Sequence, residues 1–155
     1  MKKFLILVSL FTFLIVGCRK TENLISFHYF DKDIWKRFDF VQFSFNIKDT
    51  ETEWDVWIIV EHTPAFEGRS LPLSIEMITP SGDSRILDLE AYLRSTKDGN
   101  YLGEAKEDYY VVKTLSFQGI RFNEKGICKF EIENYNHKYY TQGVKTLGIE
   151  FKRAE

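Results

Sequence analysis

Cys18 is the residue whose chemistry is clearest, because it ends the four-residue motif Ile15-Val16-Gly17-Cys18. This motif has the form of a bacterial lipobox. The small Gly17 leaves room for a peptidase at the bond before the cysteine, and the thiol of Cys18 accepts a diacylglyceryl group. Cleavage then makes Cys18 the first residue of the mature chain, and its new amine can be acylated. The motif therefore predicts lipidation at Cys18.

The residues before the lipobox have the organisation of a secretion signal. Lys2 and Lys3 give a positive start, and the run Phe4–Val16 is almost wholly apolar. A run of this length fits the apolar region of a signal peptide and falls short of the ~20 residues that a membrane-spanning helix needs. We expect residues 1–17 to be a removable signal peptide and residues 18–26 to be the lipidated cysteine and a short tether. An ordinary signal peptide, or a buried helix with an incidental cysteine, is the alternative.

The three histidines, His28, His62 and His137, do not form a recognisable metal site. They lie far apart, on or beside different predicted strands, and no HxH, HxxE or HExxH spacing occurs. We expect all three at the surface or at strand edges. The sequence predicts neither a metal nor any other cofactor.

Carboxylates offer a second possible chemistry, because a pair of them across a cleft can hydrolyse glycosidic bonds. Four acidic residues cluster in the long connection 96–108, at Asp98, Glu104, Glu107 and Asp108. Nothing in the sequence places two of them across a cleft. No GxSxG motif, Walker loop or Ser-His-Asp pattern is found either. We expect that the protein is not an enzyme, and a hydrolase is the third hypothesis.

Alternation of apolar and polar residues predicts β-strands after the tether. In 39–48, Val41, Phe43, Phe45 and Ile47 share one face and polar residues share the other, as in a half-buried strand. Similar patterns, separated by turn signals, predict about eight strands, at 25–30, 39–48, 54–63, 71–79, 85–89, 109–117, 127–133 and 143–152. We therefore expect an all-β fold, an antiparallel β-sandwich of jelly-roll or immunoglobulin-like type, in one domain at 27–155.

Two longer connections interrupt this pattern, at 61–70 and 96–108. Long loops on a rigid scaffold often carry binding sites. Cys128, by contrast, lies in a predicted strand in register with Phe130 and Ile132, so we expect it to be buried and chemically inert.

Length and charge limit the possible classes. The chain has 155 residues, enough for one domain, and 44% of them are hydrophobic, which excludes wholesale disorder. Removal of residues 1–17 takes away two of the 21 basic residues and none of the 23 acidic ones, so the net charge changes from −2 to −4. A weakly acidic chain has no general attraction for nucleic acid, and we expect no nucleic-acid partner.

The aromatic residues leave two interpretations open. They make up 16% of the chain, with 14 Phe and 8 Tyr. Such residues fill the core of a sandwich or form a recognition surface. We take Trp35 and Tyr101 as the candidate interaction surface. An exposed platform of such rings would bind glycans, and no other small-molecule ligand is expected.

Several short segments follow one another in a definite order. They are Phe27-His28-Tyr29 with Ile34-Trp35, Phe43–Thr50, Val60–Thr63, Leu71-Pro72-Leu73 with the turn Pro80–Gly82, Asp88–Leu93, Gly99–Gly103, Phe122–Gly126, and Gly143-Val144 with Leu147–Glu150. This order, together with the lipobox and the total length, resembles the gliding-motility lipoprotein family GldH of Bacteroidota.

The resemblance implies a non-enzymatic accessory lipoprotein that is needed for gliding and is associated with type IX secretion. Its partners would be the membrane, through the lipid on Cys18, and proteins of the cell envelope. Arg19, rather than Asp, follows the cysteine, which favours the outer membrane, facing the periplasm. The alternative function is a glycan-binding lipoprotein with a β-sandwich binding module.

Overall fold

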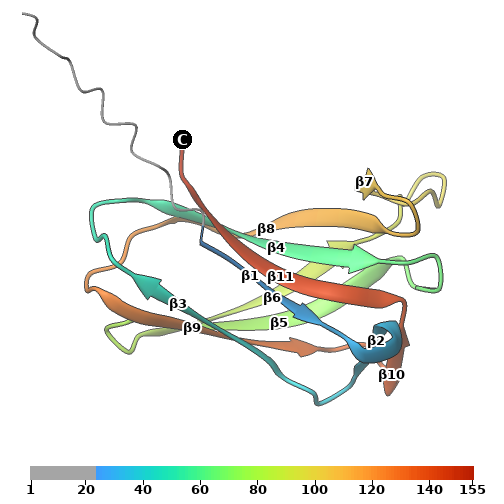
Figure 1. Cartoon of the computed structure of the whole chain (residues 1–155), viewed down its shortest axis with the longest axis horizontal. Helices are drawn as coiled ribbons and strands as arrows, with labels where there is room; N and C mark the ends of the chain where they lie inside the picture. The colour runs from blue at the N-terminus through green and yellow to red at the C-terminus, as the bar shows by residue number, and fades with distance from the viewer. Residues whose placement is uncertain (1–23) are drawn as a thin grey trace, which may run out of the picture.

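The computed structural model describes residues 24–155, in which two antiparallel β-sheets pack face to face (Figure 1). Cys18 and the segment expected to be a signal peptide, residues 1–17, lie outside the described residues. The five-stranded sheet has the order β1 (Leu24–Tyr29), β11 (Val144–Arg153), β4 (Trp54–His62), β8 (Tyr110–Ile120) and β7 (Glu104–Ala105). The four-stranded sheet has the order β3 (Val41–Ile47), β9 (Gly126–Asn134), β5 (Ser70–Ile78) and β6 (Ser84–Tyr92).

A short ribbon of β2 (Ile34–Lys36) and β10 (Tyr140–Gln142) completes the strands, and one 3-10 turn, η1 (Asp31–Asp33), precedes it. The predicted antiparallel sandwich is confirmed, and each of the eight predicted strands is present. The sequence missed β2, β7 and β10 because two or three residues are too few to show a period of two. The first strand begins at Leu24, inside the segment expected to be tether.

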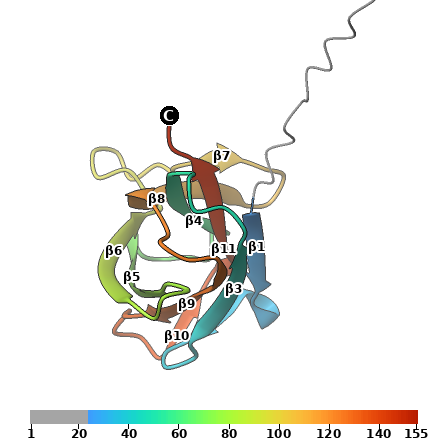
Figure 2. The same ribbon diagram turned by 90° about the vertical axis from the view of Figure 1, so that its left-hand side faces the viewer.

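The core lies between the two sheets, whose strands face each other in the end-on view of Figure 2. Strand β3 alternates buried and exposed residues over its whole length, in the register that the sequence predicts. Phe45 packs edge to face against Phe130 and Phe151, with ring centroids 6.0 and 4.9 Å away. Strand β4 lies in the middle of its sheet and buries residues on both of its faces. Residues 24–155 contain no helix with the length and hydrophobicity to span a bilayer.

Cys128 is fully buried in β9, as predicted. Burial raises the pKa of its thiol to about 12, because the charged thiolate is poorly solvated there. The thiol is therefore a packing group in the folded chain.

The sandwich has two distinct ends (Figure 1). At one end, β1 begins at Leu24, next to the end of β11 and the start of β4. We call this the Leu24 end, and the β5–β6 turn also lies there. At the other end, β4, β6 and β9 finish and β5, β8 and β10 start. We call this the β10 end.

Replacing Phe45 tests the register of the core. We expect Phe45→Ala to lower the free energy of unfolding by about 3–5 kcal/mol, because the ring leaves a cavity between the sheets. Ser44→Ala, on the exposed face of the same strand, should change it by less than about 0.5 kcal/mol. Urea unfolding followed by circular dichroism measures both, and equal effects of the two substitutions would contradict this register.

Candidate functional site

The loop between β4 and β5, residues 63–69, organises the β10 end. The ring of Phe66 is buried, and the Phe66 N–H donates to the carbonyl of Thr63 over 3.0 Å. The Thr63 N–H donates in turn to the carbonyl of Gly143 over 2.9 Å. Gly143 has φ +80°, and a Cβ there would lie 2.2 Å from the backbone nitrogen of Phe66. Only glycine allows the loop to approach the chain this closely.

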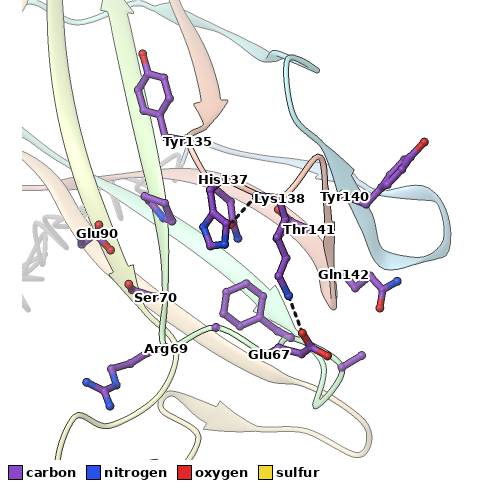
Figure 3. A pocket seen from close by; sticks show the side chains of 15 residues that line it. Glu67, Arg69, Ser70, Glu90, Tyr135, His137, Lys138, Tyr140, Thr141 and Gln142 are labelled. Atoms are coloured by element: carbon purple, nitrogen blue, oxygen red, sulfur yellow. Dashed lines mark hydrogen bonds and ion pairs between the residues drawn. The ribbon is translucent and has the colours of Figure 1, made fainter.

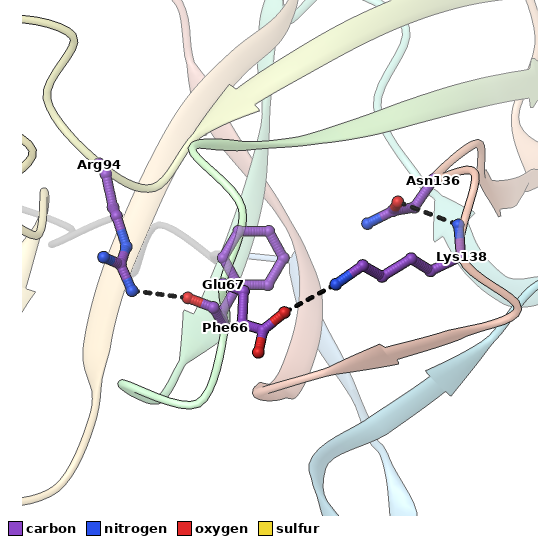
Figure 4. Close-up of polar contacts among 5 residues, drawn as sticks. All are labelled: Phe66, Glu67, Arg94, Asn136 and Lys138. Carbon is purple, nitrogen blue, oxygen red and sulfur yellow. Dashed lines mark hydrogen bonds and ion pairs between the residues drawn. The ribbon is translucent and has the colours of Figure 1, made fainter.

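Arg94 holds one side of this loop (Figure 4). Its Nη2 donates to the carbonyl of Phe66 over 2.8 Å and to the hydroxyl of Tyr101 over 3.2 Å. The guanidinium also lies 4.5 Å from the centroid of the Tyr101 ring, within the range of a cation–π contact. One arginine thus joins the β4–β5 loop to the connection that follows β6.

Aromatic rings continue from Tyr101 into the end of the sandwich. Tyr101 stacks on Tyr110 with centroids 4.6 Å apart, and Tyr110 stacks on His62 with centroids 5.6 Å apart. Tyr101 is half-buried, and these contacts engage its ring as well as its hydroxyl. Its suggested role in an interaction surface therefore stays a prediction, and only the solvent-facing part of the ring is available for it.

His62 is fully buried at the end of β4, so the expectation of a surface or edge histidine is wrong for this residue. Neither ring nitrogen has a hydrogen-bond partner of normal geometry. Burial lowers the pKa of His62 below its usual value, although the nearby backbone of Leu102 and Thr63 offsets part of this effect. The imidazole is therefore neutral in the folded chain near pH 7 and serves as an aromatic packing group.

A cavity of about 780 Å³ opens on the other side of the β4–β5 loop (Figure 3). Its walls come from this loop, from the start of β5, from the β9–β10 connection and from β10. The lining residues are Ala65, Phe66, Glu67, Gly68, Arg69, Ser70, Pro72, Glu90, Tyr135, Asn136, His137, Lys138, Tyr140, Thr141 and Gln142. Its volume falls within the ~300–1,000 Å³ of typical ligand sites.

One ion pair links the two loops that border the cavity. Lys138 Nζ lies 2.7 Å from Glu67 Oε2 (Figures 3 and 4). The hydrogen bond and charge of Lys138 hold the pKa of Glu67 below its usual value. Both side chains are exposed, and ion pairs in water contribute little to stability. The pair can therefore open without a large cost to the fold.

Trp35 does not lie at the surface, which corrects its place in the candidate interaction surface. The side chain is 0% exposed, and its ring stacks on Phe30 with centroids 4.8 Å apart. Its Nε1–H donates to the carbonyl of Asp39 over 2.8 Å. The ring is therefore covered by the core, and the polar atom of the side chain has its hydrogen-bond partner within the protein. Trp35 is therefore a structural residue.

The acidic cluster of 96–108 stays away from the cavity. Asp98, Glu104, Glu107 and Asp108 are all exposed, and none lines it. Among residues 24–155, no three His, Cys, Asp or Glu side chains gather as a metal site would require. The connection 61–70 does border the cavity. No sequence pattern pointed to Tyr135 or Lys138, which come from a short connection between strands.

Residues 24–151 match the family model for the GldH lipoprotein. The chain belongs to the GldH lipoprotein family. Comparison with curated proteins finds no match. The family is not an enzyme family, and the segment order that resembles GldH lies within the matched range. Membership also indicates association with the cell envelope, as for other lipoproteins.

Solved structures resemble this GldH chain only weakly. A family GH115 4-O-methyl-alpha-glucuronidase with specificity for decorated arabinogalactans has a TM-score of 0.42 at 15% identity, covering 79% of this chain and 14% of the enzyme. The infectious bursal disease virus VP2 subviral particle has a TM-score of 0.35 at 16% identity, covering 84% of this chain and 33% of VP2. The chain thus spans a small share of each.

The buried His62 predicts a pH dependence of stability. The unfolded chain takes up a proton at this residue near pH 6.5, whereas the folded chain does so only at lower pH. Unfolding therefore becomes more favourable as the pH falls below 6.5, until the folded form also binds the proton.

We expect the free energy of unfolding to fall more steeply between about pH 7 and pH 5 in the wild type than in His62→Phe. Phe keeps an aromatic ring at this position and cannot titrate. Urea titrations at several pH values measure this difference. The groups common to both proteins cancel in the comparison, so identical pH profiles would show that His62 is not buried as a neutral ring.

Proposed function

We propose that the protein is lipidated at Cys18, is anchored in the outer membrane facing the periplasm, and acts as a non-enzymatic accessory component of the gliding motility and type IX secretion machinery. It would work through contacts with other envelope proteins. The observation that carries this proposal is the family match over residues 24–151. The lipobox at residues 15–18 supports the anchor, and two or more acyl chains suffice for stable attachment.

The short tether defines how such a protein would sit on the membrane. Five residues, 19–23, separate the lipidated cysteine from the first residue of β1. Even fully extended, they reach only about 20 Å. The Leu24 end would therefore lie near the bilayer, and the β10 end, with its cavity, would face the aqueous compartment. This orientation leaves the β10 end accessible to envelope proteins.

A glycan-binding lipoprotein is the alternative function. Trp35 is buried and cannot belong to an exposed aromatic platform, and much of Tyr101 is engaged internally. The observation that still favours a glycan is the cavity, where two exposed tyrosines, Tyr135 and Tyr140, lie among polar groups. Rings of this kind can stack on sugars.

Deleting the gene tests the proposed role. We expect the deletion strain to lose spreading motility, if the host glides, and secretion of proteins that depend on the type IX system. Wild-type protein supplied in trans should restore both. Motility on agar and proteomic analysis of the culture medium measure the effect. A deletion strain with unchanged secretion, motility and assembly of envelope complexes would contradict the proposal.

Replacing Cys18 tests the anchor. Cys18→Ala should abolish fatty-acid labelling and leave an unprocessed precursor, because the thiol that receives the diacylglyceryl group is gone. Cys128→Ala is the matched control, since it removes the only other cysteine and should leave labelling intact. Labelling with a clickable palmitate analogue, followed by electrophoresis, measures both variants. Normal labelling of Cys18→Ala would exclude lipidation at this residue.

A further inference from the structure

The cavity at the β10 end lies where the four-stranded sheet comes apart. Strand β9 pairs with β5 as far as Asn134, opposite Leu73, and the Tyr135 N–H still donates to the carbonyl of Pro72 over 3.0 Å. The chain then leaves β5 and returns as β10, which pairs with β2 instead. Among the described strands, β10 has no partner on its other side, and the cavity separates it from β5.

The free edge of β10 presents backbone groups to this cavity. On the β2 side, the Arg37 N–H donates to the carbonyl of Tyr139 over 2.7 Å, and the Gly143 N–H donates to the carbonyl of Asp33 over 2.8 Å. In an antiparallel pair only alternate residues bond to the neighbouring strand. The N–H and carbonyl groups of Tyr140 and Gln142 therefore point away from β2.

The opposite wall offers a similar edge. The Leu93 N–H donates to the carbonyl of Arg69 over 2.9 Å, and Ser70 lies opposite Tyr92. By the same alternation, the N–H and carbonyl of Ser70 point away from β6, towards the cavity that Ser70 lines. The two strands that face each other across the cavity thus both have backbone groups available for a further strand.

We propose that this cavity binds an extended polypeptide segment of a partner protein, which adds as a strand to the free edge of β10. Addition of a strand to an exposed edge is a common mode of peptide recognition, in which main-chain hydrogen bonds supply affinity and side-chain pockets supply specificity. The inference rests on the proposed function, because it names the kind of contact through which the protein would act.

Side chains around the cavity fit a peptide of mixed character. Pro72 provides apolar surface, while Tyr135 and Tyr140 are exposed beside it. The charges that line it are balanced, with Glu67 and Glu90 against Arg69 and Lys138. No strong field of one sign would select a highly charged ligand.

A buried hydrogen bond holds β10 in place, so its free edge exists before a ligand binds. The Asn134 side-chain amide donates to the hydroxyl of Thr141 over 2.8 Å, and both residues are buried. This bond joins the end of β9 directly to β10. A rigid edge costs less entropy on binding than one that must first be ordered.

Tyrosines mark the same end of the molecule as a recognition surface. Each of the eight tyrosines lies at a strand end or connection on the β10 side, and none is buried. They are Tyr29, Tyr92, Tyr101, Tyr109, Tyr110, Tyr135, Tyr139 and Tyr140. Tyrosine is enriched in protein interfaces because it combines a large apolar ring with a polar tip. None of these residues lies at the Leu24 end.

The residues before β1 cannot supply the segment that fills the cavity. The chain preceding β1 joins the sandwich at Leu24, at the end opposite the cavity. From there a six-residue strand, about 20 Å long, already separates Leu24 from the β10 end. A tether of five residues that is also held at the membrane cannot cover this distance and fill the cavity.

A peptide selection on the intact protein tests the proposal. The acylated full chain, purified in detergent, would be used to select from a phage library of random twelve-residue peptides, and bound peptides would be synthesised. We expect them to bind Gln142→Ala within about twofold of the wild type and Gln142→Pro at least about tenfold more weakly. Proline removes the N–H that points into the cavity but no hydrogen bond to β2, whereas alanine removes only the side chain.

A change in the ligand provides a test that leaves the protein untouched. Two forms of each selected peptide would carry N-methyl groups on alternate backbone amides, one on the odd-numbered and one on the even-numbered amides. One of the two forms should lose binding to the wild type, because only alternate amides of an added strand bond to β10. Retention of binding by both methylated forms, or equal affinity for Gln142→Pro and wild type, would overturn strand addition. So would a selection that enriches no peptide, or equal losses in Gln142→Ala and Gln142→Pro. A glycan array that shows binding, blocked by no peptide, would assign the cavity to a glycan.

These outcomes are distinguishable from a failure of the proposed function. The peptide experiments measure binding to the purified protein and do not depend on motility or secretion. Complementation of the deletion strain connects the binding experiments with the proposed function. We expect the Gln142→Ala variant to restore motility and secretion, and the Gln142→Pro variant, present at the same protein level, not to restore them. If the deletion has no phenotype, the secretion role fails while the binding results stand by themselves.

Discussion

Burial of Phe66 is the constraint on which the β10 end depends. The ring enters the core while the next residue, Glu67, points outward to Lys138. This reversal requires the loop to press against Gly143, where no side chain fits. The carbonyl of Phe66 accepts a hydrogen bond from Arg94. One buried ring thus fixes a shared wall, with the aromatic stack of Tyr101 on one side and the cavity on the other.

The sequence predicted the long strands, whose alternation of apolar and polar residues continues over many positions. It did not predict the short strands and the contacts that close the ends of the sandwich. Phe45 could be placed in the core because its strand alternates over seven residues. Trp35 could not, because its strand has three residues and its burial depends on pairing with β10, where Thr141 lies opposite. His62 ends a central strand that is buried on both faces, and the two-sided apolar pattern of 54–63 was the signal that could have placed it inside.

The cavity could not be predicted from the sequence, because its walls come from distant parts of the chain. Glu67 and Lys138 are 71 positions apart, and only the crossing of the chain from β9 to β10 brings their loops together. The long connection 61–70 marked one wall in advance, but nothing marked the other. The structure also shows where the many aromatic residues lie. Several phenylalanines fill the core, whereas the tyrosines are exposed or half-buried, and their hydroxyls can bind water or a partner.

Site-specific photo-crosslinking in living cells tests most directly whether the β10 end is the working surface of this anchored sandwich. A photoreactive amino acid would replace His137, beside the cavity, or Ser81, in the exposed turn at the Leu24 end. Crosslinks to a discrete envelope protein from position 137, and none from position 81, are the predicted result. Crosslinks from position 81 alone, or equally from both positions, would contradict the assignment of function to the β10 end.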